Sequence, residues 1–122
     1  MLSGATVLVI EEEFLIALDI ERMLQALSVK QVLFARDAEE AQGMRIALSE
    51  ISLAIVEINS WRQHSLASID RYLAAGIKVV LSTADSALRN GVRQFPGTPV
   101  VCKPMTEQDL VQAIGIVLMK RD

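Results

Sequence analysis

The feature that most constrains the fold of this chain is a regular alternation between short apolar runs and segments with helical periodicity. The apolar runs are rich in Val, Ile and Leu, which is typical of strands that are covered on both faces of a parallel sheet. They are TVLVI (6–10), QVLFA (31–35), SLAIVEI (52–58), KVVLST (78–83) and PVVC (99–102). We therefore expect five buried strands.

The segments between these runs predict helices. Apolar residues recur at helical spacing over 16–27, 41–48, 66–73 and 110–118. Thr106 with Asp109 forms a capping pattern at the start of the last helix, and Asp37 with Glu40 offers a similar start for the second. The fourth connection, DSALRNGVRQFPGTP (85–99), has two glycines and two prolines, so it holds at most a short helix before a loop.

A strand–helix alternation of this kind folds as a parallel sheet with helices on both faces, because its crossovers are right-handed. The length of 122 residues fits one domain, and we expect residues 1–122 to form a single domain without an output domain. We find no linker, repeat or low-complexity tract in the sequence.

The composition excludes several classes of function. Apolar residues make up 52% of the chain and charged residues 22%, and the net charge of −3 comes from dispersed charges without the basic stripe of a nucleic-acid binder. Cys102 is the only cysteine, so no internal disulfide forms. No signal peptide and no apolar stretch of about 18 residues is found, so we expect a cytoplasmic protein without membrane contact.

Polar side chains gather where the predicted strands end. In a parallel sheet the carboxyl ends of the strands meet at one edge, and ligands bind there near the topological switch point. The residues at that edge are Glu11 and Glu12 after the first strand, Glu57 at the third, Ser82 and Thr83 at the fourth, and Lys103 after the fifth. Three acids, hydroxyls and one lysine are thus expected to converge.

Over its whole length this pattern resembles the receiver domain of bacterial response regulators, the CheY-like family. The matching pieces are VLVIEEEFL, IVEIN, VLSTA and VCKP, in this order and at the family's spacing. The resemblance implies a flavodoxin-like (βα)5 fold with strand order 2-1-3-4-5 and, here, a short or degenerate fourth helix. It also implies a cis peptide bond between Lys103 and Pro104.

The resemblance assigns a role to each polar residue at the strand ends. Glu11 and Glu12 stand at the acidic pair that holds Mg²⁺, and Glu57 stands where an aspartate accepts a phosphoryl group from a histidine kinase. Thr83 and Lys103 match the hydroxyl and lysine that bind the phosphoryl oxygens. A further match is Asn59, at the residue whose backbone carbonyl helps to hold the metal.

The departures from the family concern the chemistry of this site. Glutamate replaces aspartate at the acceptor and at both positions of the acidic pair, so each carboxylate lies one methylene further out. Mg²⁺ requires near-ideal octahedral geometry at about 2.0–2.1 Å, and a misplacement of about 1 Å can cost ~10²-fold in rate. We therefore expect no cofactor. Val100 occupies the place of the aromatic switch residue, and Trp61 replaces a usual proline.

We expect Glu57 to pair with Lys103 without a metal, reaching toward Thr83 and Lys103 as a phosphoryl group would. The chain is then a stand-alone pseudo-receiver, not an enzyme, that acts by protein–protein interaction in a phosphorelay. Its expected partners are a histidine kinase, a phosphotransfer protein, another response regulator or a second copy. Trp61 is either a partner contact or a ring folded over the pocket.

Other interpretations of the same residues stay open. A receiver that is still phosphorylated on Glu57 is the main alternative, and Glu11, Glu12 and Glu57 could also be ordinary acids, at a helix N-terminus or at a strand end. A small-molecule site lacks support because three carboxylates, and no glycine-rich loop, follow the first strand. His64 is interpreted as a solvated residue, and Cys102 as a small buried apolar one.

Overall fold

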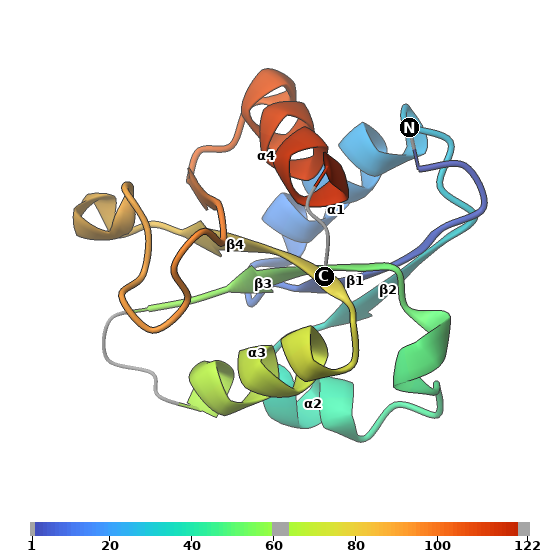
Figure 1. Ribbon diagram of the computed structural model, residues 1–122. Coiled ribbons are helices and arrows are strands. Elements are labelled where there is room, and N and C mark those ends of the chain that lie inside the picture. Colours follow the sequence, from blue (N-terminus) through green and yellow to red (C-terminus); the bar gives the residue numbers. More distant parts are fainter. Residues whose placement is uncertain (1, 60–63, 120–122) are drawn as a thin grey trace.

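The computed structural model describes residues 2–59 and 64–119, which form a five-stranded parallel sheet between two layers of helices (Figure 1). The sheet order is β2-β1-β3-β4-β5, and every neighbouring pair is parallel. The strands are β1 (Thr6–Ile10), β2 (Gln31–Ala35), β3 (Leu53–Glu57), β4 (Lys78–Thr83) and β5 (Val100–Cys102). The predicted strands and their flavodoxin-like order are confirmed.

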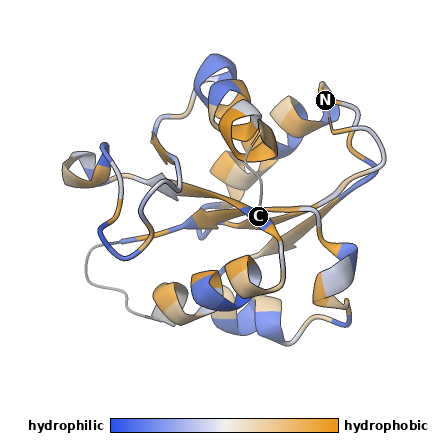
Figure 2. Ribbon diagram, viewed as in Figure 1, coloured by the Kyte–Doolittle hydropathy of each residue, from blue (hydrophilic) through white to orange (hydrophobic). Residues whose placement is uncertain are grey.

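The helices divide between the two faces of the sheet. They are α1 (Phe14–Gln25), α2 (Ala38–Gln42), α3 (His64–Ala74) and α4 (Glu107–Met119), with the short 3-10 turns η1 (Leu48–Glu50) and η2 (Ser86–Leu88). Helices α1 and α4 cover one face and α2 and α3 the other (Figure 1). Figure 2 shows that the strands are largely hydrophobic and that the helices on both faces carry hydrophobic as well as hydrophilic residues.

Each strand contributes side chains to two separate cores because successive residues point to opposite faces. Val9 and Ile55 are fully buried in the core under α1 and α4, together with Ile114 of α4. Val56 and Leu81 are fully buried in the opposite core, where Ile69 of α3 packs. The near-continuous apolar runs of the sequence thus reflect burial on both faces.

The second helix is shorter than the sequence pattern predicts. Its start is confirmed, because the Asp37 carboxylate accepts a hydrogen bond of 2.8 Å from the backbone N–H of Glu40. It ends at Gln42, however, where the Gly43 N–H closes the last turn. Met44 and Leu48 lie beyond this end and still pack on the core as partly buried residues, so their helical spacing was misleading.

The fourth connection contains no full helix, as the sequence predicts. Between β4 and β5 the described chain forms the single turn η2 and then a loop in which Val92 and Phe95 form an isolated bridge. Gly91 and Gly97 both adopt positive φ values in this loop, of 119° and 82°, which favour glycine over other residues. In the described chain, η2 is therefore the single helical turn between β4 and β5 (Figure 1).

Candidate functional site

The strand ends bring three of the predicted residues into contact. Glu11 directly follows β1, Glu57 is the last residue of the central strand β3, and Lys103 directly follows β5. The Lys103 ammonium lies 3.1 Å from Oε1 and 3.3 Å from Oε2 of Glu11, and it forms a second, short ion pair with Oε2 of Glu57. The ion pair expected between Glu57 and Lys103 is therefore present.

This ion-pair cluster is nearly excluded from solvent. The exposed fraction of the side chain is 1% for Glu11, 6% for Lys103 and 11% for Glu57. Two carboxylates and one ammonium share the space, so the formal charge of the three groups together is −1. Buried charges need partners of this kind, because an isolated ion in a protein interior is strongly disfavoured.

Two backbone amides complete the contacts of the carboxylates, and sequence reasoning missed both. The N–H of Glu12 donates to Oε1 of Glu57 at 2.9 Å, and the N–H of Glu13 donates to Oε2 of Glu11 at 2.9 Å. These amides precede α1, which begins at Phe14. The signal was available, because N–H groups at a helix start have no partner within the helix and favour anions.

Burial and pairing shift the pKa values within the cluster. Burial raises the pKa of the Glu11 carboxyl above its ordinary value of 4.5, and the Glu13 amide and the Lys103 ammonium only partly oppose this. Burial alone would lower the pKa of Lys103. Its hydrogen bonds with Glu57 and Glu11 outweigh that effect and raise the pKa above 10.5.

The raised pKa of Lys103 predicts a loss of stability at alkaline pH. Because the folded state holds the proton more tightly, this contribution is complete below pH 10.5 and disappears as the pH rises through the folded value. Tyr72 adds a loss in the same range, since burial also raises its pKa above 10.0. Urea unfolding between about pH 8 and 11.5 should therefore show a steeper alkaline decline in the wild type than in Lys103→Met. Equal slopes would contradict the buried pairing of Lys103.

The Thr83 hydroxyl, which is the predicted switch hydroxyl, lies at the site but forms its hydrogen bond with a residue outside the ion-pair cluster. Thr83 is fully buried at the end of β4, and its Oγ1 accepts a hydrogen bond of 3.0 Å from the backbone N–H of Asp85. In the described ranges no hydrogen bond joins Thr83 to Glu57, so the expectation that Glu57 reaches both Thr83 and Lys103 is met only for Lys103. The Thr83 hydroxyl instead stabilises the turn that leads into η2.

The neighbouring hydroxyl, on Ser82, is buried without a hydrogen-bond partner in the described part of the chain. Ser82 is in register with Glu57 across the β3–β4 ladder, so the two side chains emerge on the same face of the sheet. Most buried hydroxyls have a partner, so Ser82 is an exception among the buried polar groups.

Glu12 and Glu13 are exposed at the start of α1, and Asn59 is partly buried two residues after Glu57. Trp61 lies outside the described residues, so both interpretations of it stay predictions. The Lys103–Pro104 peptide bond is cis, as the resemblance implies. Cys102 is half-buried, not buried as predicted, because it lies on the edge strand β5.

The arrangement does not fit a divalent cation. In the described part of the chain, no group of three or more His, Cys, Asp or Glu side chains is arranged to hold a metal ion. Glu11 and Glu57 already bind the Lys103 ammonium and two backbone amides. An ion at this site would have to displace the lysine and break those hydrogen bonds, and the preference of Mg²⁺ for strict octahedral geometry makes the exchange unfavourable.

Comparisons with known proteins place the fold. No family model matches the sequence, and no curated protein matches it. Solved structures do match. A response regulator from Thermotoga maritima superimposes with a TM-score of 0.75 and 21% identity, covering 96% of this chain and 99% of that one. The chain has the fold of a response-regulator receiver domain.

Two further structures support the receiver fold over almost the whole chain. The receiver domain of PhyR from Erythrobacter litoralis matches with a TM-score of 0.72 and 21% identity, covering 98% of this chain and 94% of that one. SdrG from Sphingomonas melonis matches with a TM-score of 0.71 and 24% identity, covering 98% and 100%. At these identities the similarity shows the fold, while the chemistry of the site has to be argued from its own residues. No helix between residues 2 and 119, outside the gap at 60–63, has the length and apolarity that a membrane crossing needs.

Proposed function

We propose that this chain is a pseudo-receiver, a receiver-fold protein of two-component or phosphorelay signalling that acts by protein–protein interaction without being phosphorylated. The observation that carries the proposal is the buried contact of the Lys103 ammonium with both Glu57 and Glu11. In the family that the sequence resembles, this lysine binds the phosphoryl group on the acceptor aspartate. Here the longer Glu57 side chain itself supplies the anionic oxygen to the lysine.

The contacts of Glu57 support its role as a permanent substitute for the phosphorylated residue. One of its oxygens pairs with Lys103, and the other accepts from the Glu12 amide. A phosphoryl group carries about −1.5 to −2 charges, whereas Glu57 carries one, and Thr83 does not take part. Glu57 therefore reproduces the lysine contact of the phosphorylated state and lacks its hydroxyl contact.

The engaged carboxylates also oppose phosphorylation. A nucleophile has to reach about 3–3.5 Å from the reacting phosphorus in line with the leaving group. Both oxygens of Glu57 are held by donors, and among the described residues no group of three or more His, Cys, Asp or Glu side chains could hold a metal beside them. Attack would first require breaking a buried ion pair, which costs several kcal/mol, on the order of 3–5.

An apolar surface beside the cluster supports a protein partner. Phe14 and Leu15 at the start of α1 are 72% and 79% exposed, and Leu18 and Phe34 lie partly exposed near them. A cavity of about 260 Å³ is lined by Phe14, Leu18 and Phe34 together with Glu12. Contiguous exposed apolar residues of this kind typically mark interaction sites. We infer a cytoplasmic signalling partner such as a histidine kinase, a phosphotransfer protein or another response regulator.

Treatment with acetyl phosphate and Mg²⁺, followed by intact-mass measurement, tests the proposal. We expect the mass of the wild type to stay unchanged after this treatment. The matched comparison is the mass of the treated Glu57→Asp variant, because its shorter side chain retreats from Lys103. A stable adduct of one phosphoryl group on the wild type that disappears in Glu57→Gln would instead establish a phosphorylatable receiver.

A further inference from the structure

Ser82 brings a buried hydroxyl to the end of β4. The residue has no exposed surface, and among the described residues its Oγ has no hydrogen-bond partner. A buried hydroxyl without a partner destabilises a fold, and an apolar side chain of similar shape would avoid that cost. The group that this hydroxyl can bind is therefore of interest.

The alternation of side chains along the strands places Ser82 on the same face of the sheet as the ion-pair cluster. The residues that lie two positions before the site on four strands all belong to the core under α1 and α4; they are Val9, Ile55, Val80 and Val101. Successive residues of a strand point to opposite faces. Glu11, Glu57, Ser82 and Lys103 therefore all point to the face that α1 and α4 cover.

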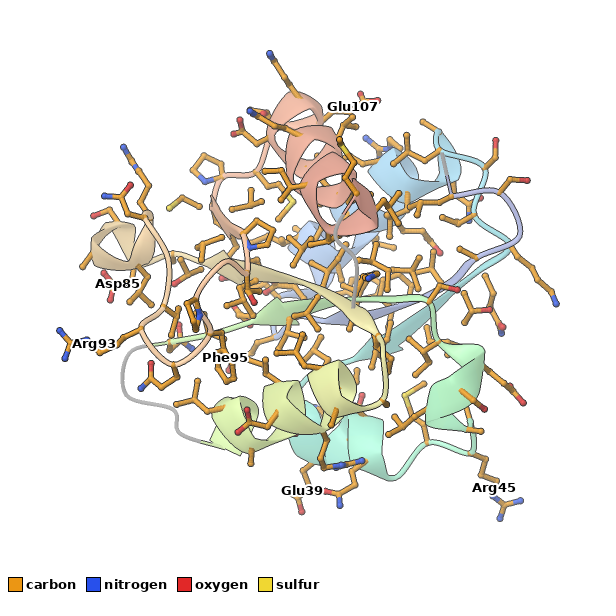
Figure 3. The ribbon with its side chains drawn as sticks, viewed as in Figure 1. Glu39, Arg45, Asp85, Arg93, Phe95 and Glu107 are labelled. Atoms are coloured by element: carbon orange, nitrogen blue, oxygen red, sulfur yellow. The ribbon has the colours of Figure 1, made fainter. Side chains whose placement is uncertain are left out.

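The neighbouring hydroxyl, on Thr83, belongs to the opposite face. Thr83 lies two positions after Leu81, which packs in the core under α2 and α3. Its Oγ1 accepts from the backbone N–H of Asp85, and Figure 3 shows Asp85 at the turn η2. Of these two adjacent hydroxyls, the one that faces the cluster is thus that of Ser82.

Glu57 is the member of the cluster that Ser82 can reach. The two residues are directly in register on adjacent parallel strands, which lie about 4.7–4.9 Å apart. Glu11 follows β1, one strand further away. The three hydrogens of the Lys103 ammonium match its three contacts with carboxylate oxygens. A carboxylate oxygen of Glu57 is therefore the acceptor within reach when this side chain turns about its own bonds.

We propose that Ser82 is a positioning residue of the site, which gives the Glu57 carboxylate a second hydrogen-bonded position. In the observed position, Oε1 of Glu57 accepts from the Glu12 N–H at 2.9 Å. In the second position, Oε1 accepts from the Ser82 hydroxyl while Oε2 stays with Lys103. Because the ion pair persists in both positions, the exchange leaves no buried charge without its partner.

This exchange links the cluster to the start of α1. The Glu12 amide lies two residues before Phe14, which begins α1 and is 72% exposed. A partner that binds this surface and prefers one position of Glu57 would shift the carboxylate toward it. The inference deepens the proposed function and rests on Glu57 as the permanent anion of the site.

Relaxation-dispersion NMR of the full chain, without a phosphate donor or Mg²⁺, tests the role of Ser82. We expect the Glu12 amide of the wild type to show exchange on the microsecond-to-millisecond timescale, with the second position populated at about 1–10%. Ser82→Ala should abolish this exchange, and Ser82→Thr, which keeps a hydroxyl, should retain it. The matched control Thr83→Val removes the hydroxyl on the opposite face. It should shift the Asp85 amide signal and leave the Glu12 exchange unchanged.

Two kinds of result would overturn the proposal. A Glu12 amide without exchange in the wild type, or with the same exchange in Ser82→Ala, would mean that Glu57 has no second position on Ser82. Loss of the exchange in Thr83→Val or in Ser82→Thr would attribute it to altered packing at the end of β4. The proposed function fails separately, since it is decided by whether acetyl phosphate phosphorylates the wild type.

Discussion

We expect Lys103→Met to lower the free energy of unfolding by about 3–5 kcal/mol at neutral pH. The substitution keeps the side chain long and apolar but removes the ammonium between two buried carboxylates. Among the described residues, backbone amides are then the partners that remain to Glu11 and Glu57. The loss should shrink as the pH falls, because a carboxyl whose pKa is raised by burial takes up a proton more readily.

Urea unfolding monitored by circular dichroism measures this effect. The matched control is Lys30→Met, which removes an exposed lysine and should change the free energy by no more than about 0.5 kcal/mol. Adding Glu57→Met to Lys103→Met should recover part of the loss, since one unpaired carboxylate is removed with its partner. A loss below about 1 kcal/mol for Lys103→Met would mean that the cluster is solvated and not a buried ion pair.

The second large effect is expected for Ile114→Ala in α4. Ile114 is fully buried and packs on the sheet with Val9, Ile55 and Leu110. Truncation removes buried methyl groups and leaves a cavity, which typically costs about 2–5 kcal/mol. The free energy of unfolding should fall by this amount while the β4 and β5 strands keep their register.

Helix α4 itself offers the control for this prediction. Ile116→Ala changes the same residue type two positions later, at a side chain that is 45% exposed, and should cost less than about 1 kcal/mol. Similar losses for both variants would show that α4 does not pack as described.

Much of the fold could be predicted from the sequence because burial on both faces leaves a clear pattern. The apolar runs located all five strands, β5 included. The second helix was predicted too long, because Met44 and Leu48 repeat at helical spacing while packing from beyond its end, Leu48 from the separate 3-10 turn η1. The spacing of apolar residues indicates which side chains reach the core. It does not indicate whether the backbone between them is helical.

The sequence predicted which residues form the candidate site, but it did not predict all the hydrogen bonds between them. Strand ends converge on one edge, so Glu11, Glu57 and Lys103 followed from topology. The direction of the Thr83 hydroxyl did not, because a short local bond to the Asp85 amide competes with a longer one to Glu57.

A crystal structure of the protein grown with Mg²⁺ tests the central claim most directly. Our account predicts that the Lys103 ammonium stays in contact with Glu11 and Glu57, with no ion between the carboxylates. An octahedral Mg²⁺ bound by Glu12 and Glu57, with Lys103 displaced, would contradict it.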